Sequence, residues 1–578
     1  MNNQQIADIF GRIADLLGIR GDSYHRILAY RRASENIESW GQDLSTMLAD
    51  GSLTTIPGIG ETLADKIEEM LTTGKLGFYE RLTDEIPESL IDVLRVDGVG
   101  PKKAKLFYDK LEICSIAELK AAAEGEQLRA LAGMGAKSEA KILAGIAALE
   151  RHGDRRTPLG EALPIAEGIL ATLAAVPGVT KTAIGGSLRR RRDDIGDIDL
   201  LVAADEAGEV MDTFGAWPDV EEVVQRGPTK MRVMLRGGIG VDLRVLPAER
   251  WGTLLSYFTG SQAHNIRLRE LALQKGYHLN EHAFTPVDGG EEILCADEEA
   301  VYAQLGLPYI PAALREDRGE IEAAEGGMLP QLIKREDIIS DLHMHTTWSD
   351  GKQTVLEMAQ AAYERGYEYI VITDHSQSLG IANGLTPERV REQRAEIEAA
   401  QAEMGDKIRI FQGTEMEIKA DGSLDFPDEL LAELDFVIAS LHVSLRQNRD
   451  QIMNRFLAAV HNPHVDMIAH PTGRLLPERP GADVDMEELF REAAAMGTIL
   501  EINANPRRLD LRDSHIRRAR EHRVVLAINC DAHAREHFDL LNYGVETAQR
   551  GWATPADIIN SWPLAKFERY LQTKLRED

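Results

Sequence analysis

Cysteine, aromatic residues and long apolar runs are all scarce in this chain of 578 residues. The three cysteines, Cys114, Cys295 and Cys530, lie far apart and match neither a disulfide framework nor a zinc-finger spacing, which predicts a reducing, cytoplasmic location. No apolar run approaches the roughly 18 residues of a membrane helix. The first residues, MNNQQIADIF, lack the basic start of a secretory signal. We therefore expect neither a disulfide-stabilised fold nor a membrane partner.

Positive charge is also in short supply, because 65 lysines and arginines face 95 aspartates and glutamates, for a formal net charge of −30. This balance argues against a protein that coats DNA without selectivity, since such binding depends on a basic surface. It leaves room for local basic patches. The length allows several domains, each with its own core, and an apolar share of 43% is ordinary for globular proteins.

Residues 1 to about 150 show helical periodicity and a glycine turn that occurs three times. The copies are IPGIGETLADKIEEML (56–71), VDGVGPKKAKLFY (96–108) and LAGMGAKSEAKIL (131–143), of which the third is the least basic. A Gly-x-Gly turn before a helix offers backbone N–H groups to a phosphate, so the pattern is typical of helix-hairpin-helix DNA binding. A plain helix connector is the alternative for any single copy. The candidate DNA contacts are Gly58, Gly60, Gly98, Gly100, Lys102 and Lys103.

Three aspartates between residues 165 and 250 predict a first metal site. Asp197 and Asp199 alternate in GDIDLL, which places both carboxylates on one side of a strand. Asp242 lies in KMRVMLRGGIGVDLRVLP (230–247), which predicts a hairpin of two neighbouring strands. Such carboxylates suit a pair of Mg²⁺ ions, which can hold both oxygens of a phosphoryl transfer. An Asp-x-Asp alone is as often a solvated strand edge.

A glycine turn precedes the paired aspartates at a spacing of about ten residues. Gly185, Gly186 and Ser187 offer backbone N–H groups and a hydroxyl to a triphosphate, and Arg190 can add charge-assisted hydrogen bonds. The turn, the paired aspartates and the later aspartate together are far more specific than any one of them. They indicate nucleotide binding.

From about residue 337, seven strand-like runs alternate with helices, which predicts a parallel α/β sheet or barrel. Six of these runs end in residue types that bind metals. Ligands at the carboxyl ends of successive parallel strands meet at one mouth. A mixed set of histidines and carboxylates without thiolates suits Zn²⁺, Mn²⁺ or Fe, and so many candidates imply more than one ion. The candidates are His343, His345, Asp350, His375, Glu415, His442, His470, Asp531 and His533.

The motifs DLHMHTTWSDG, ITDHS, GTEMEI, SLHVS, IAHP and CDAH resemble those of the polymerase and histidinol phosphatase (PHP) domain over about 337–578. This resemblance implies a distorted seven-stranded barrel with a trinuclear centre. The nine candidates would hold two or three Mn²⁺, Zn²⁺ or Fe ions. PHP domains include phosphatases and 3′–5′ exonucleases, so the motifs alone do not name the substrate.

Residues 1 to about 315 resemble the nucleotidyltransferase superfamily, and in their order the family X DNA polymerases with the layout of DNA polymerase beta. The resemblance implies catalytic Asp197, Asp199 and Asp242 with Mg²⁺ or Mn²⁺. SYFTGSQAHNIRLRE strengthens it. The implied contacts to the incoming nucleotide are Tyr257, Phe258, Gly260, Ser261 and Asn265, beside Gly186, Ser187 and Arg190, and Arg269 is an implied minor-groove contact to DNA.

The N-terminal region resembles the lyase domain of the same polymerases. Lys66 falls on the Schiff-base lysine that removes a 5′-deoxyribose phosphate, and Arg26 and Tyr30 fall on contacts to the 5′-phosphate. Thr62 stands where a phosphate-binding lysine is expected. A surface lysine on a helix is the alternative for Lys66.

These observations predict a multidomain polymerase that fills short gaps in nicked or gapped DNA from deoxynucleoside triphosphates, and that trims 3′ ends or cleaves abasic sites with its PHP domain. A monomer is expected. Three alternatives remain, namely a PHP nuclease with a weak nucleotide-binding palm, a barrel that serves only as a platform, and a phosphatase of small molecules. The expected domains are a lyase-like helical domain (1–80), a helix-hairpin-helix fingers-type domain (81–155), a nucleotidyltransferase palm (156–250), a thumb (251–315), a linker (316–336) and the PHP domain (337–578).

Overall fold

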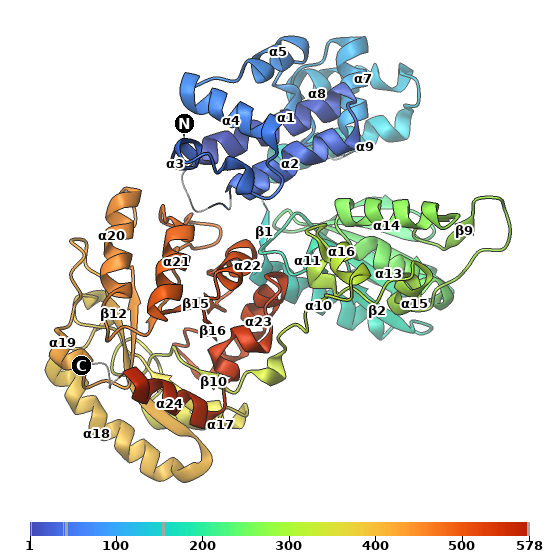
Figure 1. Cartoon of the computed structure of the whole chain (residues 1–578). Coiled ribbons are helices and arrows are strands. Elements are labelled where there is room, and N and C mark those ends of the chain that lie inside the picture. The colour runs from blue at the N-terminus through green and yellow to red at the C-terminus, as the bar shows by residue number, and fades with distance from the viewer. Residues whose placement is uncertain (2, 39, 41–43, 97, 153–155, 575–578) are drawn as a thin grey trace.

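The computed structural model describes residues 1–578 apart from 2, 39, 41–43, 97, 153–155 and 575–578. The chain forms an all-helical N-terminal region, a mixed α/β middle region and a parallel α/β C-terminal region, as Figure 1 shows. The predicted fold class is thereby confirmed. The predicted boundary after residue 155 lies outside the described residues. No helix in the described part of the chain has the length and apolar character needed to cross a membrane.

The N-terminal region is a bundle of helices built on amphipathic sequences. Helix α1 buries Ile6, Phe10 and Leu17, which recur at helical spacing, against α2. The three glycine turns share one geometry, because Gly58, Gly98 and Gly133 all have φ between 77° and 85°, where a side chain is strained. The helices are α1 (Asn3–Arg20), α2 (Tyr24–Glu38), α3 (Leu44–Ala49), α4 (Glu61–Thr73), α5 (Gly77–Glu85), α6 (Leu90–Val93), α7 (Pro101–Leu111), α8 (Ile116–Glu124) and α9 (Ala136–His152).

The middle region, where the palm is expected, centres on a five-stranded sheet of order β2-β4-β7-β6-β5. The predicted hairpin is confirmed, because β6 pairs antiparallel with β7, and β7 in turn pairs parallel with β4. The register sets Asp199 of β4 beside Asp242 of β7. The elements are β1 (Thr157–Pro158), α10 (Leu159–Ala174), β2 (Lys181–Ile184), α11 (Gly186–Arg189), β3 (Asp194–Ile195), β4 (Asp197–Ala203), α12 (Gly208–Gly215), β5 (Val220–Arg226), β6 (Lys230–Leu235) and β7 (Gly240–Leu246).

The segment after the palm and the start of the expected linker share one core. Ile321 and Ala324 are buried in the same cluster as Leu268 and Phe284, and the buried Glu320 carboxylate lies 2.7 Å from the His264 ring. The charged sequence of this connector therefore conceals an apolar face and a buried polar pair. The elements are α13 (Trp251–Thr259), α14 (Gln262–Gln274), β8 (Tyr277–Leu279), β9 (Phe284–Pro286), α15 (Glu298–Gln304) and α16 (Glu320–Glu325).

The C-terminal region holds a seven-stranded parallel sheet in sequential order, β10 to β16. Its two edges are drawn together into a near-barrel, since Asp341 accepts a hydrogen bond from the Cys530 amide and Asn529 accepts one from the Leu342 amide. The strands are β10 (Ser340–Asp341), β11 (Tyr369–Ile372), β12 (Arg409–Glu417), β13 (Phe436–Ser440), β14 (Met467–Ile468), β15 (Ile499–Asn503) and β16 (Leu526–Asn529). The helices are α17 (Val355–Glu364), α18 (Pro387–Met404), α19 (Asp428–Leu431), α20 (Arg449–Val460), α21 (Met486–Met496), α22 (Asp513–Glu521), α23 (Leu541–Arg550) and α24 (Leu564–Lys574).

The inside of this near-barrel is apolar at one end and polar at the other. Phe567 of α24 stacks on Tyr369 at a ring distance of 4.7 Å and belongs to a cluster with Phe436, Met467 and Ile499. This cluster fills the amino-terminal end of the strands. The carboxyl ends are thereby left for side chains of another kind.

Candidate active sites

The nine predicted metal ligands all come from the carboxyl ends of strands in the C-terminal sheet or from the loops that follow, and Glu415 lies at their centre. Its carboxylate is 2.9 Å from Nδ1 of His375, 2.9 Å from Nε2 of His470, 3.3 Å from Nε2 of His343 and 3.4 Å from Nε2 of His442. Burial works against its ionisation, but the surrounding histidines lower the pKa of Glu415 well below its ordinary value. A buried carboxylate among imidazoles has the chemistry to ligate more than one cation.

The ligand atoms fall into three overlapping groups, each compact enough for one cation. One group joins His345, Asp350, His375 and His533, and a second joins His343 and His345 with Glu415. The third joins His375, Glu415 and His442. Asp531 lies 3.2 Å from Nε2 of His345 and borders the second group. Because the groups share members, the geometry suits a cluster of ions better than one isolated ion.

Several buried polar atoms in this cluster have no hydrogen-bond partner among the described residues. Buried polar groups are otherwise almost always paired, so this concentration fits a set of metal ligands. The fit rests on chemistry as well as position, because imidazoles and carboxylates are the groups that Zn²⁺, Mn²⁺ and Fe accept. The atoms are Nε2 of His343, both ring nitrogens of His345, Nδ1 of His375, Nδ1 of His470 and Oε2 of Glu415.

Two further glutamates orient the ligands, and sequence reasoning missed both. Glu501 of β15 lies 2.7 Å from Nδ1 of His343 and also accepts the backbone amide of His470 at 2.8 Å. Glu417 of β12 lies 2.8 Å from Nδ1 of His442. Such contacts fix the ring orientation and leave Nε2 for the metal. Glu501 belongs to the sixth strand-like run, TILEINANP, which was expected to end without a ligand. The one sequence feature that could have identified Glu501 is the presence of an acidic residue within an otherwise apolar strand.

Replacing Glu501 with glutamine is therefore expected to lower the metal affinity of the barrel by about 10- to 100-fold, since the His343 ring loses its charged partner. Metal retained after dialysis against a chelator series measures the effect. Glu521→Gln, at the exposed end of α22, is the control. Equal metal retention in Glu501→Gln and the unaltered protein would contradict an orienting role for Glu501.

The palm gathers its three aspartates at one edge of the sheet. Asp199 is partly buried beside Asp242, Asp197 is half-exposed, and Arg232 of β6 forms ion pairs with Asp242 and, at 3.4 Å, with Asp197. Burial and then the neighbouring carboxylates of Asp197 and Asp242 raise the pKa of Asp199 to about 8. Crowded carboxylates of this kind are stabilised in their charged form by divalent cations.

The glycine turn lies directly against these carboxylates. Gly186 has φ of 61°, and a Cβ there would collide with the Asp199 carboxylate. Gly185 is packed against the Asp199 side chain and the Phe258 carbonyl, and Ser187 lies half-buried in the short helix α11. Only glycine permits this close approach of backbone to carboxylate. Arg190, the predicted phosphate contact, is buried and donates to the Thr259 carbonyl and to Glu316, both at 2.9 Å.

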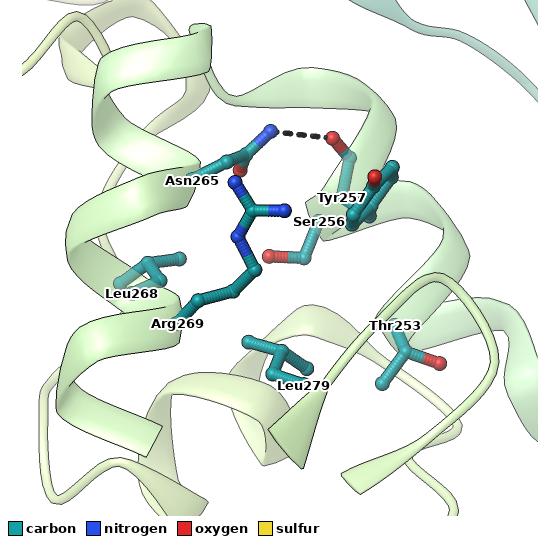
Figure 2. A pocket seen from close by; sticks show the side chains of 7 residues that line it. All are labelled: Thr253, Ser256, Tyr257, Asn265, Leu268, Arg269 and Leu279. Atoms are coloured by element: carbon teal, nitrogen blue, oxygen red, sulfur yellow. Dashed lines mark hydrogen bonds between the residues drawn. The ribbon is translucent and has the colours of Figure 1, made fainter. Parts of the chain in front are cut away.

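The aromatic segment at the end of α13 forms a small pocket with α14, as Figure 2 shows. Asn265 donates from its amide to the carbonyls of Tyr257, at 2.7 Å, and Gly260, at 3.1 Å, while Arg269 lies beside it. A Cβ at Gly260 would collide with the Asn265 side chain, and Ser261 caps α14 by accepting the His264 amide. The Phe258 ring lies 5.0 Å beneath the Arg244 guanidinium of β7. The predicted nucleotide contacts are thus adjacent to the palm.

A polar cleft opens at the palm carboxylates and includes one residue from the N-terminal region. Lys141 of α9 lines it together with Asp199, Asp242 and Arg244. Lys141 belongs to the third glycine-turn copy, which is the least basic of the three. Its place in the cleft depends on how two regions meet, so no local pattern could have found it.

The three predicted lyase residues surround the Phe78 ring. The Arg26 guanidinium lies 5.2 Å and the Lys66 ammonium 5.5 Å from the ring centre, and Tyr30 stacks on it at 5.9 Å. Lys66 also approaches the Thr62 carbonyl at 3.5 Å. Among the hairpin candidates, Gly60 and Gly100 cap the starts of α4 and α7, Lys102 is exposed, and Lys103 donates to the Gly98 carbonyl at 2.7 Å.

Comparison with known families matches four stretches of the chain. Residues 1–76 match a helix-hairpin-helix domain and residues 90–148 match a tandem of the same motif. Residues 254–316 match the DNA polymerase beta thumb, and residues 341–505 match the PHP domain. The region beyond 505, which carries Asp531 and His533, lies outside the matched stretch.

Comparison with individual proteins covers the whole chain. The DNA polymerase/3′-5′ exonuclease PolX of Bacillus subtilis is 39% identical over 574 residues, which span 99% of this chain and 100% of that protein. DNA polymerase lambda of Rattus norvegicus is 26% identical over 54% of this chain and 56% of its own length. A probable phosphatase of Thermoanaerobacter pseudethanolicus is 28% identical over 42% of this chain and 97% of its own length. The chain belongs to the bacterial family X DNA polymerases that carry a 3′–5′ exonuclease and a C-terminal PHP domain.

Proposed function

We propose that the palm adds deoxynucleotides to the 3′ end of short gaps in DNA and that the PHP barrel removes 3′-terminal nucleotides. The observation that supports this most is the presence of two separate ligand sets in one chain, one of aspartates and one mainly of histidines. Hard carboxylates suit Mg²⁺ or Mn²⁺, and the mixed set suits two or three Mn²⁺, Zn²⁺ or Fe ions. The same hydrolytic site is proposed to cleave at abasic sites.

In the palm, Asp197, Asp199 and Asp242 would hold the ions, which when bound neutralise the developing charge of phosphoryl transfer. The chain's own groups do the rest. The Gly186–Ser187 turn presents backbone N–H groups and a hydroxyl to the triphosphate, with Arg190 directly after the short helix α11. The sugar of the incoming nucleotide lies against Tyr257, Phe258, Gly260 and Ser261. The minor groove of the nascent base pair faces Asn265 and Arg269.

The DNA contacts are proposed to lie on the backbone rather than on the bases. The hairpin turns at Gly58 and Gly98 precede α4 and α7, whose N-cap residues Gly60 and Gly100 have no side chain to occupy the N–H groups of the first turn. Backbone contacts do not select a sequence, which suits repair of gaps in any context. With few basic contacts on a chain of net charge −30, binding is expected to be salt-dependent. A cytoplasmic location and a monomeric state complete the proposal.

The test is extension and shortening of a 5′-labelled primer on one-nucleotide-gapped DNA, with Mg²⁺ or Mn²⁺, and with or without deoxynucleotides. Extension with deoxynucleotides and shortening without them supports both activities. Shortening alone would favour a nuclease with a weak palm. Extension alone, with a barrel that retains no metal, would favour the platform alternative.

We also propose a 5′-deoxyribose-phosphate lyase activity at Lys66. Its ammonium lies among Arg26, Tyr30 and Phe78, a basic and partly apolar surround suited to a 5′-phosphate beside an aldehyde. Lys66→Ala is expected to abolish borohydride trapping of the protein on a 5′-deoxyribose-phosphate substrate, because the Schiff base loses its amine. Lys75→Ala, an exposed lysine just beyond α4, is the control. Trapping that persists in Lys66→Ala would assign the chemistry to another amine or exclude it.

A further inference from the structure

A chain of buried charges joins the loop after the palm's glycine turn to helix α23 of the PHP domain. Glu316 accepts hydrogen bonds from Arg190 at 2.9 Å and from Arg550 at 3.0 Å. Arg550 donates its other amino group to Asp513 at 2.6 Å, and Arg318 reaches the same carboxylate at 3.0 Å. The cluster lies outside both proposed ligand sets. Positive and negative groups alternate along it, so every buried charge has a partner of opposite sign.

The contact reaches the loop's backbone as well as its side chains. Arg550 donates to the carbonyl oxygen of Arg190 at 2.8 Å, and the Arg190 amide is itself bonded to the Gly186 carbonyl at 3.3 Å. Arg550 is therefore two hydrogen bonds from the residue that must pack against Asp199. Its side chain is only 6% exposed, so this link is shielded from water. A rigid guanidinium holding three acceptors fixes geometry better than a flexible ammonium would.

Further contacts attach the palm to the PHP domain around this link. Arg191 pairs with Glu546 of α23 at 2.9 Å, and Asp193 pairs with Arg474 at 2.9 Å. Leu509 of the PHP domain is buried within the palm's own core cluster. A Cβ on Gly160 of α10 would lie 2.6 Å from Pro506, which shows how closely the two surfaces fit. The palm thus uses the PHP domain as part of its frame.

We propose that Arg550 is a positioning residue for polymerisation, which holds α11 and the Gly186–Ser187 turn so that nucleotide binding in the palm depends on the docked PHP domain. This inference rests on the proposed nucleotide-binding role of that turn. Arg550 need not touch the nucleotide, since it acts through the backbone of Arg190. The exonuclease site, centred on Glu415, belongs to other strands and does not require this contact.

The test compares the full-length protein with Arg550→Met, which keeps the aliphatic stem and removes the guanidinium. We expect the apparent Kd for the incoming deoxynucleotide in single-turnover gap filling to rise by about tenfold or more, because a small displacement of a positioning group has large effects. Primer shortening without deoxynucleotides should stay at the unaltered rate. Arg365→Met is the matched control, since Arg365 pairs with Asp539 within the PHP domain at 2.8 Å.

Two other variants separate the possible outcomes. Glu546→Gln weakens the neighbouring, more exposed link and should give a smaller rise in the same Kd. Ser187→Ala tests the nucleotide-binding role of the turn by itself.

A rise in Kd with Ser187→Ala and an unchanged Kd with Arg550→Met and Glu546→Gln would overturn the inference and leave the proposed function intact. Unchanged values in all three would remove the turn from nucleotide binding. Loss of extension and shortening in equal proportion, with a lower melting temperature, would assign Arg550 to general stability and overturn its positioning role.

Discussion

Asp199→Asn is expected to reduce primer extension by about 10³-fold or more while 3′ shortening continues at the unaltered rate, since it removes a charge on which the palm ions depend. Asp199 lies beside Asp242 on the neighbouring strand and touches the glycine turn, so it is the point where proposed ions and nucleotide meet. Asparagine preserves the shape of the side chain and one acceptor oxygen, and it removes the charge. The loss would therefore report charge and not packing.

The measurement is single-turnover extension of a one-nucleotide gap, with shortening followed on the same preparation. Asp205→Asn is the matched control, because Asp205 is an exposed aspartate just beyond β4. Extension at the unaltered rate in Asp199→Asn would remove the palm from catalysis. That result would favour the alternative of a PHP nuclease whose palm binds nucleotide only weakly.

Glu415→Gln is expected to produce the opposite pattern, with shortening reduced by about 10³-fold or more and extension retained, because the proposed ions would lose a carboxylate that two ligand groups share. The Glu415 carboxylate lies within 3.4 Å of four histidines and belongs to two of the three ligand groups. Glutamine fits the same space but cannot neutralise cations.

Metal content and shortening are measured together for this variant. Glu403→Gln, at an exposed position near the end of α18, is the control. A Glu415→Gln protein that shortens primers as fast as the unaltered protein would take the exonuclease away from the barrel. If the unaltered barrel proves free of metal while extension is normal, the platform alternative is favoured. Hydrolysis of small phosphate esters in preference to DNA would favour the phosphatase alternative.

The PHP ligand set shows how much a sequence can reveal about a site. His343 and His345 alternate after the first strand, and the same residue types follow the other strands at their carboxyl ends. Parallel strands all end at one edge, so ligands that are 190 positions apart in the printed sequence still converge. The predicted seven strands and hairpin are confirmed because alternation and periodicity are local properties. The sequence analysis did not identify Glu501, because a residue that orients a ligand occurs at no fixed spacing in the sequence.

The palm shows which side-chain contacts a local sequence pattern can predict and which it cannot. Asp197 and Asp199 were predicted to share one side of a strand, and the structure has them there with Asp242 on the adjoining strand. Arg190 was predicted as a phosphate contact, yet its side chain is engaged by Glu316 and Thr259. The sequence offers four consecutive arginines with no sign of which faces the nucleotide and which faces another domain. Its role in nucleotide binding stays a prediction.

By itself, the sequence determined the elements, the two ligand sets and the family resemblance, since each depends on residue types at fixed spacing within a strand, turn or helix. Only the tertiary structure decided which surfaces meet. Arg190 and Arg550 are 360 positions apart, and Lys141 reaches the palm cleft from the helical region. Pairing between distant charges depends on shape and burial where two surfaces dock. These are properties of the packed chain as a whole, and no periodicity in the sequence predicts them.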